Sequence, residues 1–105
     1  MPFLTVFTTV GTQAEARQMA AALVERGLAA CAQISAIESF YTWNGTLANE
    51  AEFRVLFKTK ATLYDALEQA IRELHAYELP AIHACAVERI HPPYAAWIEG
   101  ACHAG

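Results

Sequence analysis

The chain has few positive charges and no cluster of them. Its 105 residues include 7 lysines and arginines against 11 aspartates and glutamates, which gives a formal net charge of −4 at pH 7. A protein that binds nucleic acid through the phosphate backbone needs a basic surface. The composition therefore argues against a nucleic-acid partner.

Cysteine is scarce and widely spaced. The three cysteines are Cys31, Cys85 and Cys102. An odd number at such spacing is not a disulfide framework, and without a CxxC pair there is neither a zinc ribbon nor a thioredoxin-type motif. Nucleophile-elbow, P-loop and dinucleotide-binding fingerprints are also missing. We therefore expect a protein that is not an enzyme.

Long hydrophobic runs are missing too. The apolar segment 1–11 is too short to span a bilayer, and it has neither the basic start nor the cleavage site of a signal peptide. We expect no membrane partner, a first strand in this segment and a cytoplasmic location.

What the chain does have is apolar surface. Hydrophobic residues make up 55% of the sequence and charged residues 17%. One domain over residues 1–105 is expected at this length, and so small a domain buries a limited share of its surface. Some of the apolar surface is then available for partner subunits.

Hydrophobic periodicity divides the chain into strands and helices. Thr12 and Glu15 have the spacing of a capping box at a helix start, and Gly27 suits the left-handed position after a helix. The expected order is a strand at 3–10, a helix at 12–26, a strand at 30–43, a strand after the turn at 44–45, a helix from residue 62, a strand at 81–89, a helix at 94–102 and a frayed tail.

The turn Asn44-Gly45 predicts a long hairpin, because both positions of such a turn need a positive φ. Centring the hairpin there fixes the strand register, which matches apolar residues with apolar residues on one face. The expected pairs are Trp43 with Thr46, Ala36 with Phe53, Ile34 with Val55 and Ala32 with Phe57. Each arm runs to roughly 13 residues, or ~40 Å at the strand rise. Two helices cannot cover that length, so the segment 40–50 needs another partner.

This order predicts an α+β fold of the ferredoxin-like βαββαβ type with a C-terminal helix. Right-handed crossovers place both main helices on one face of a four-stranded antiparallel sheet. The other face is then open to solvent or to partners.

Five segments in order carry a family resemblance: GLAACAQI (27–34), YTWNG (41–45), FKT (57–59), HAYELP (75–80) and YAAWI (94–98). Together they resemble the CutA family, the divalent-cation tolerance proteins. The resemblance implies a tight homotrimer whose long hairpins pack against neighbouring subunits, which would place Tyr41 or Trp43 at the trimer interface. It also implies a link to copper and divalent-metal tolerance, with copper bound by some members. A signalling role like that of PII-type trimers has been suggested for the family.

The chain departs from the family at three positions. The family motif HPYEVPE becomes HAYELPA, with Ala76 for the first proline and Ala81 for the last glutamate. Thr8 stands where some copper-binding relatives have cysteine. By resemblance, the copper ligands that remain are His75 and Cys31, with oxygen donors from Glu78 and Tyr77. We therefore expect weak copper binding and no tight site within one subunit.

Each candidate also has an ordinary structural explanation. A cationic His75 at a helix C-terminus would stabilise the helix, and Cys31 would be a small buried thiol. His83 and Cys85 lie on one face of a strand and could grip a soft metal or meet a neighbour. His91 and His103 are expected to be solvated.

A second candidate site involves aromatic rings and a lysine. Lys58 with Tyr94, Trp97 and Tyr77 could line an inter-subunit cleft for an anionic or flat ligand. The alternative is a snorkelling lysine beside core aromatics. The sequence therefore predicts a cytoplasmic, non-enzymatic homotrimer of metal homeostasis. The alternatives are a PII-like small-ligand sensor and a scaffolding trimer without a ligand.

Overall fold

A four-stranded antiparallel sheet is the frame of the molecule in the computed structural model, which describes residues 2–104. Its strand order is β2-β3-β1-β4, so β2 and β4 are the edges. The strands are β1 (Phe3–Val10), β2 (Cys31–Trp43), β3 (Thr46–Lys60) and β4 (Ile82–Ala86). The expected α+β class with a four-stranded antiparallel sheet is confirmed.

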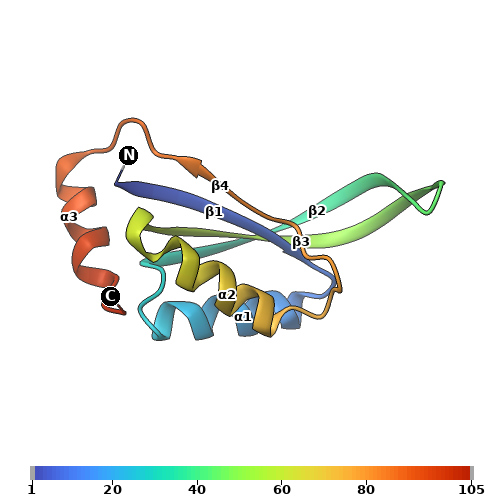
Figure 1. Cartoon of the computed structure of the whole chain (residues 1–105), viewed down its shortest axis with the longest axis horizontal. Coiled ribbons are helices and arrows are strands. Elements are labelled where there is room, and N and C mark those ends of the chain that lie inside the picture. Colours follow the sequence, from blue (N-terminus) through green and yellow to red (C-terminus); the bar gives the residue numbers. More distant parts are fainter. Residues whose placement is uncertain (1, 105) are drawn as a thin grey trace.

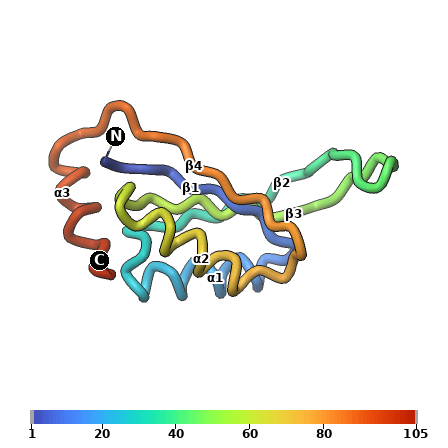
Figure 2. Tube along the Cα trace, in the orientation of Figure 1, coloured from blue at the N-terminus to red at the C-terminus, as the bar shows by residue number. Residues whose placement is uncertain are grey.

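Two helices cover one face of the sheet. They are α1 (Gln13–Glu25) and α2 (Tyr64–Leu74), and they lie side by side beneath the strands (Figures 1 and 2). A third helix, α3 (Pro92–Ala101), lies at the end of the sheet farthest from the hairpin tip. No helix within residues 2–104 is long and apolar enough to cross a membrane.

The core lies between the sheet and these two helices. Val6, Val55 and Phe57 from the strands are fully buried against Leu23 of α1 and Leu67 of α2. They recur at every second position in the strands and every third or fourth position in the helices, which is the pattern used to predict the elements. Burying a side chain of this kind contributes roughly 1.5–3 kcal/mol.

The start and the end of α1 follow from local chemistry. Thr12 is the N-cap, and its hydroxyl oxygen accepts a hydrogen bond from the Glu15 amide at 3.1 Å. Gly27 has a φ of +72°, as expected for a helix stop. Of the tail predicted to be frayed, residues 103 and 104 contact the turn after α1, and residue 105 lies outside the described residues. The Ala104 amide donates to the Gly27 carbonyl at 3.2 Å, and the His103 ring lies where a side chain at position 27 would stand.

Three predicted boundaries are wrong by two residues or more, one of them at α3, which begins at Pro92 rather than at residue 94. Thr62 does not begin α2 but lies in a 3-10 turn, Ala61–Leu63, that precedes it. The last strand ends at Ala86 rather than at residue 89. Ala86 pairs with Leu4 near the start of β1, so there is almost no strand left for the later residues to pair with.

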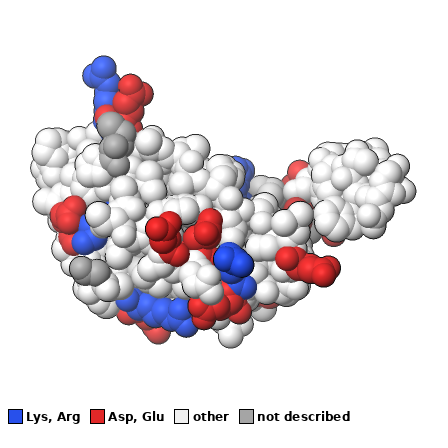
Figure 3. Space-filling view, in the orientation of Figure 1, with Lys and Arg blue, Asp and Glu red and all other residues white. Residues whose placement is uncertain are grey.

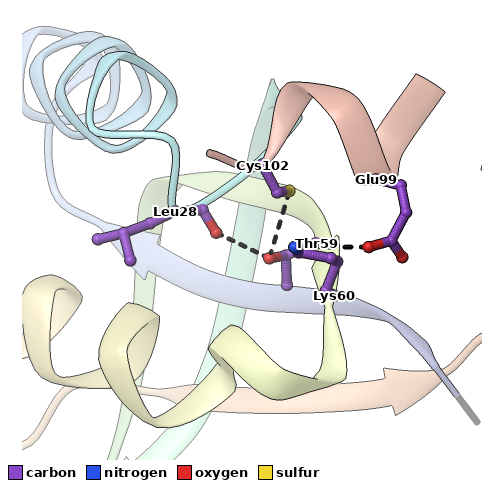
Figure 4. Close-up of polar contacts among 5 residues, drawn as sticks. All are labelled: Leu28, Thr59, Lys60, Glu99 and Cys102. Carbon is purple, nitrogen blue, oxygen red and sulfur yellow. Dashed lines mark hydrogen bonds and ion pairs between the residues drawn. The ribbon is translucent and has the colours of Figure 1, made fainter. Parts of the chain in front are cut away.

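Helix α3 is attached through the end of β3 (Figure 4). The Thr59 hydroxyl donates to the Leu28 carbonyl at 2.7 Å and lies 3.9 Å from the Cys102 sulfur. Beside it, the Lys60 ammonium is 3.5 Å from the Glu99 carboxylate. These contacts surround a second small apolar cluster between α3 and the sheet.

The hairpin register is confirmed pair by pair. All four predicted pairs occur, and Asn44 and Gly45 have φ values of +51° and +77°. Strand β1 pairs with β3 only as far as Val10 opposite Phe53. From the pair Ile37–Glu52 to the tip, β2 and β3 pair only with each other. We call residues 37–52 the distal ribbon; it extends the molecule to 45 × 25 × 22 Å (Figure 1).

Candidate functional site

A pocket of about 590 Å³ lies at the base of the distal ribbon. Three segments meet there: the end of β1, the two ribbon strands, and the loop that joins α2 to β4. We call it the ribbon-base pocket. Its lining residues are Thr9, Tyr41, Trp43, Glu50, Glu52, Ala76, Tyr77, Glu78, Leu79 and Ala81.

His75 fixes the loop that forms one wall. Helix α2 ends at Leu74, and the His75 backbone is extended. The ring Nε2 lies 2.8 Å from the Thr9 carbonyl oxygen, and Nδ1 accepts from the Tyr77 amide at 3.1 Å. A carbonyl only accepts, so these partners correspond to a neutral ring with its proton on Nε2. The first role of His75 is therefore to hold the HAYELP loop against β1.

Two tyrosines hold the carboxylates of β3. Tyr77 donates its hydroxyl to Glu52 Oε2 at 2.9 Å, and Tyr41 donates to Glu50. Burial, followed by the bond to Glu52, raises the pKa of Tyr77 well above its usual value. The bond to Glu50 raises the pKa of Tyr41. Both phenols therefore stay protonated and act as donors.

The pocket is acidic. Three carboxylates line it, from Glu50, Glu52 and Glu78, and the lining includes no lysine, arginine or histidine. Glu52 is only 7% exposed. Within residues 2–104 the one ion pair is Lys60–Glu99, close to α3. A small anion is disfavoured in such a pocket, and a cation is favoured.

The predicted metal ligands do not come together in one chain. On β2, Cys31 pairs with Lys58 of β3. Thr9 of β1, whose carbonyl contacts His75, pairs with Arg54 of β3, and Arg54 pairs in turn with Ser35 of β2. Four residues along β2 separate the two places by roughly 13 Å. Both His75 ring nitrogens already have partners. Among the residues described, no group of three or more His, Cys, Asp and Glu side chains is placed to hold a metal ion.

The donors of a single subunit therefore do not fit a metal centre. Two of the three departures from the family, Ala76 and Ala81, lie in the pocket lining. The third, Thr8, is on the helix-covered side of the sheet, and its buried hydroxyl has no partner. Whether His75, Cys31 and Glu78 bind metal in an assembly stays a prediction.

The second predicted set is divided between the two ends of the sheet. The Lys58 ammonium lies 5.3 Å from the Tyr94 ring centroid, and the Tyr94 and Trp97 rings stack at 5.7 Å. The neighbouring Tyr94 side chain is the main cause that raises the pKa of Lys58. Tyr77 lies instead in the ribbon-base pocket. An inter-subunit cleft formed by all four residues also stays a prediction.

The remaining histidine and cysteine candidates are on the outer face of the sheet or at its ends. His83 and Cys85 are both exposed on β4, and the His83 ring stacks on Phe7 at 4.9 Å. His91 is exposed before α3. Sequence reasoning missed Glu50 and Glu52. Their i, i+2 spacing on a strand was the available signal, because it places two carboxylates on one face.

The fold and the pocket define a class: an α+β chain with helices on one face of an antiparallel sheet and a long unpartnered ribbon. The profile of the CutA1 divalent ion tolerance protein family matches residues 4–101, and the chain belongs to this family.

Relatives agree in sequence and in shape. The chain is 37% identical over 94 residues to Protein CutA of Mus musculus, covering 89% of this chain and 53% of that protein. The structure of CutA from Synechococcus elongatus is 38% identical with a TM-score of 0.94, covering 96% and 90% of the two chains. That of the periplasmic divalent cation tolerance protein CutA from Archaeoglobus fulgidus is 29% identical with a TM-score of 0.94, covering 96% and 99%. The chain spans about half the length of the mouse relative.

Proposed function

We propose that this chain acts in the tolerance of divalent cations, copper among them, as a cytoplasmic, non-enzymatic homotrimer of ferredoxin-like subunits. The observation that carries the proposal is the family match across residues 4–101. A relative of the same fold from A. fulgidus is named for divalent cation tolerance. These matches do not favour the alternative of a PII-like sensor.

The distal ribbon supports the trimer. Phe40 is 63% exposed, Trp43 54% and Leu47 69%. A two-stranded ribbon is marginally stable on its own in water, and large exposed apolar patches mark contact surfaces. The outer end of the molecule also shows no charged residue in the view of Figure 3. A neighbouring subunit that covers the ribbon would account for its exposed apolar side chains, for the stability of its two isolated strands and for its lack of charge.

The geometry of a single subunit is compatible with weak metal binding at a site shared between subunits. The separation of Cys31 from His75 excludes a shared ion within a subunit, so the proposed ion needs donors from a neighbour. His75 binds it only by releasing the Thr9 carbonyl or the Tyr77 amide. The proposed location rests on the three cysteines, all free thiols, since reduced thiols are typical of the cytoplasm. The A. fulgidus relative is called periplasmic, so cell fractionation is the test of location.

Copper titration tests the metal proposal. Cu(II) is added to the wild-type chain in the presence of a competing chelator and followed by calorimetry. We expect weak binding that His75→Ala lowers, because one imidazole donor is lost. His91→Ala, which removes an exposed imidazole just before α3, is the matched control and should leave the affinity unchanged. Equal affinity in wild type and His75→Ala would remove His75 from the site.

A further inference from the structure

Two soft donor side chains lie on one face of the edge strand β4. His83 and Cys85 are two residues apart on this strand, so their side chains share a face, and it is the face that α1 and α2 leave uncovered. Both side chains are exposed, and Cys85 is the most accessible of the three free cysteines. Neither residue lines the ribbon-base pocket. The pair is therefore separate from the site described above.

The His83 ring is oriented by packing and has free nitrogens. It stacks on the ring of Phe7, its pairing partner on β1, with ring centroids 4.9 Å apart and ring planes at 13°. Within residues 2–104 neither ring nitrogen of His83 has a hydrogen-bond partner, whereas both nitrogens of His75 have one. A ring that packing already orients loses less rotamer freedom when it binds. Of these two imidazoles, His83 is the better placed to accept a metal ion.

The spacing of the pair suits a metal ion held by two donors. The strand rise puts the Cα atoms of His83 and Cys85 ~7 Å apart. A sulfur and an imidazole nitrogen on one metal ion lie about 4 Å apart, and the two side chains can cover the difference. Two donors are too few for zinc, which needs four ligands. A soft monovalent ion such as Cu(I) is stable with two, and thiolate and imidazole are both copper ligands.

We infer that each chain binds one Cu(I) ion between the Cys85 sulfur and a ring nitrogen of His83. The Cys85 thiol releases its proton to water as the sulfur–copper bond forms. Copper enters and remains as Cu(I), so no electron is transferred. The site uses neither His75 nor a second subunit, so it does not depend on the proposed trimer or on Cu(II) binding. The competing explanation is that the pair contacts a neighbouring copy of the chain.

Serine variants test the sulfur ligand. Cu(I) is titrated into the wild-type chain without oxygen, in competition with a chromogenic chelator. Loss of a group that merely orients a metal ligand typically costs about 10- to 100-fold in affinity, so Cys85→Ser, which removes a ligand, should cost at least about 100-fold. Cys31→Ser makes the same change at a half-buried cysteine on β2 and should leave the affinity unchanged. Equal losses in the two variants would mean unspecific binding to thiols and would overturn the proposal.

Phenylalanine variants test the nitrogen ligand. His83→Phe keeps an aromatic ring on Phe7 and removes both ring nitrogens, so the affinity for Cu(I) should fall at least about tenfold. His91→Phe changes an exposed histidine just before α3 and is the control, with the affinity unchanged. Amide NMR spectra check that the variants are folded. A loss in Cys85→Ser without a loss in His83→Phe would mean that sulfur alone binds the ion, and the site of two donors would be wrong.

Light scattering separates the copper site from a contact between copies. With copper removed by the chelator, Cys85→Ser and His83→Phe should have the same mass as wild type. If both variants lower the mass and the wild-type chain binds no Cu(I), the pair belongs to a contact between copies and the copper proposal is wrong. The Cu(II) titration of His75→Ala uses another ion and another variant, so either proposal can fail without the other.

Discussion

Replacing Trp43 by alanine tests whether the distal ribbon lies on a neighbouring subunit. The side chain is 54% exposed in a single chain, so about half of its surface has no partner within the subunit. Truncating a fully buried tryptophan costs about 3–5 kcal/mol. If a neighbour covers the exposed half, roughly 1.5–2.5 kcal/mol of that is lost at each interface. Three interfaces give about 4.5–7.5 kcal/mol, a weakening of trimer formation by about 10³- to 10⁵-fold.

The assay is light scattering and thermal unfolding over a range of protein concentrations. Wild type should give about three times the subunit mass of 11.5 kDa. Trp43→Ala should dissociate on dilution, and its melting temperature should fall and depend on concentration, as linkage requires of an assembly. Glu73→Ala, at an exposed position on α2 away from the ribbon, is the control. An unchanged mass and melting temperature in Trp43→Ala would mean that the ring is merely exposed, and the reasoning from the ribbon would fail.

Two further predictions concern the stability of the chain itself, measured by urea unfolding. Thr8→Val should raise the free energy of unfolding by about 1 kcal/mol, because it removes a buried hydroxyl without a partner. Thr59→Val should lower the free energy of unfolding by a similar amount, because the Thr59 hydroxyl donates to the Leu28 carbonyl. A change of the same sign in both variants would contradict this account. The pKa of Tyr77 is raised from its ordinary value of 10.0 in the folded state, so its contribution is fully present below pH 10 and is lost as the pH rises further. Tyr77→Phe should therefore reduce the loss of stability between about pH 9 and about pH 11, and an unchanged slope would assign that loss to other groups.

The fold was predictable where local patterns determine it. The register of the long hairpin follows from the Asn44-Gly45 turn and from the apolar residues counted outward from it, and every counted pair occurs in the structure. The helices followed in the same way from periodicity. The hydrophobic pattern did not predict the end of a strand that stops because it has no further strand to pair with. β4 stops at Ala86 because β1 has so little left to pair with it, and neither strand's own residues contain that information.

The site was predictable only in part, because it depends on contacts between distant segments. The HAYELP loop was identified, but its contact with β3 joins Tyr77 to Glu52, 25 residues apart. No periodicity relates a loop to a strand at that distance. The resemblance also directed attention to the imidazole of His75 as a ligand, and only the structure places that ring between Thr9 and the Tyr77 amide.

One subunit is incomplete at a single place, and in two respects. The distal ribbon exposes large apolar side chains without a cover, and the pocket at its base holds Glu52, a mostly buried carboxylate whose one hydrogen bond comes from the neutral phenol of Tyr77. Hydrophobic surface calls for a protein partner, while an unpaired buried charge calls for a positive group; the two needs have different physical origins. Because Tyr41 and Trp43 belong to both the ribbon and the pocket lining, a subunit that covers the ribbon would also close the pocket. The surroundings of Glu52 should therefore change with assembly, because the same neighbour would reach both the ribbon and the pocket.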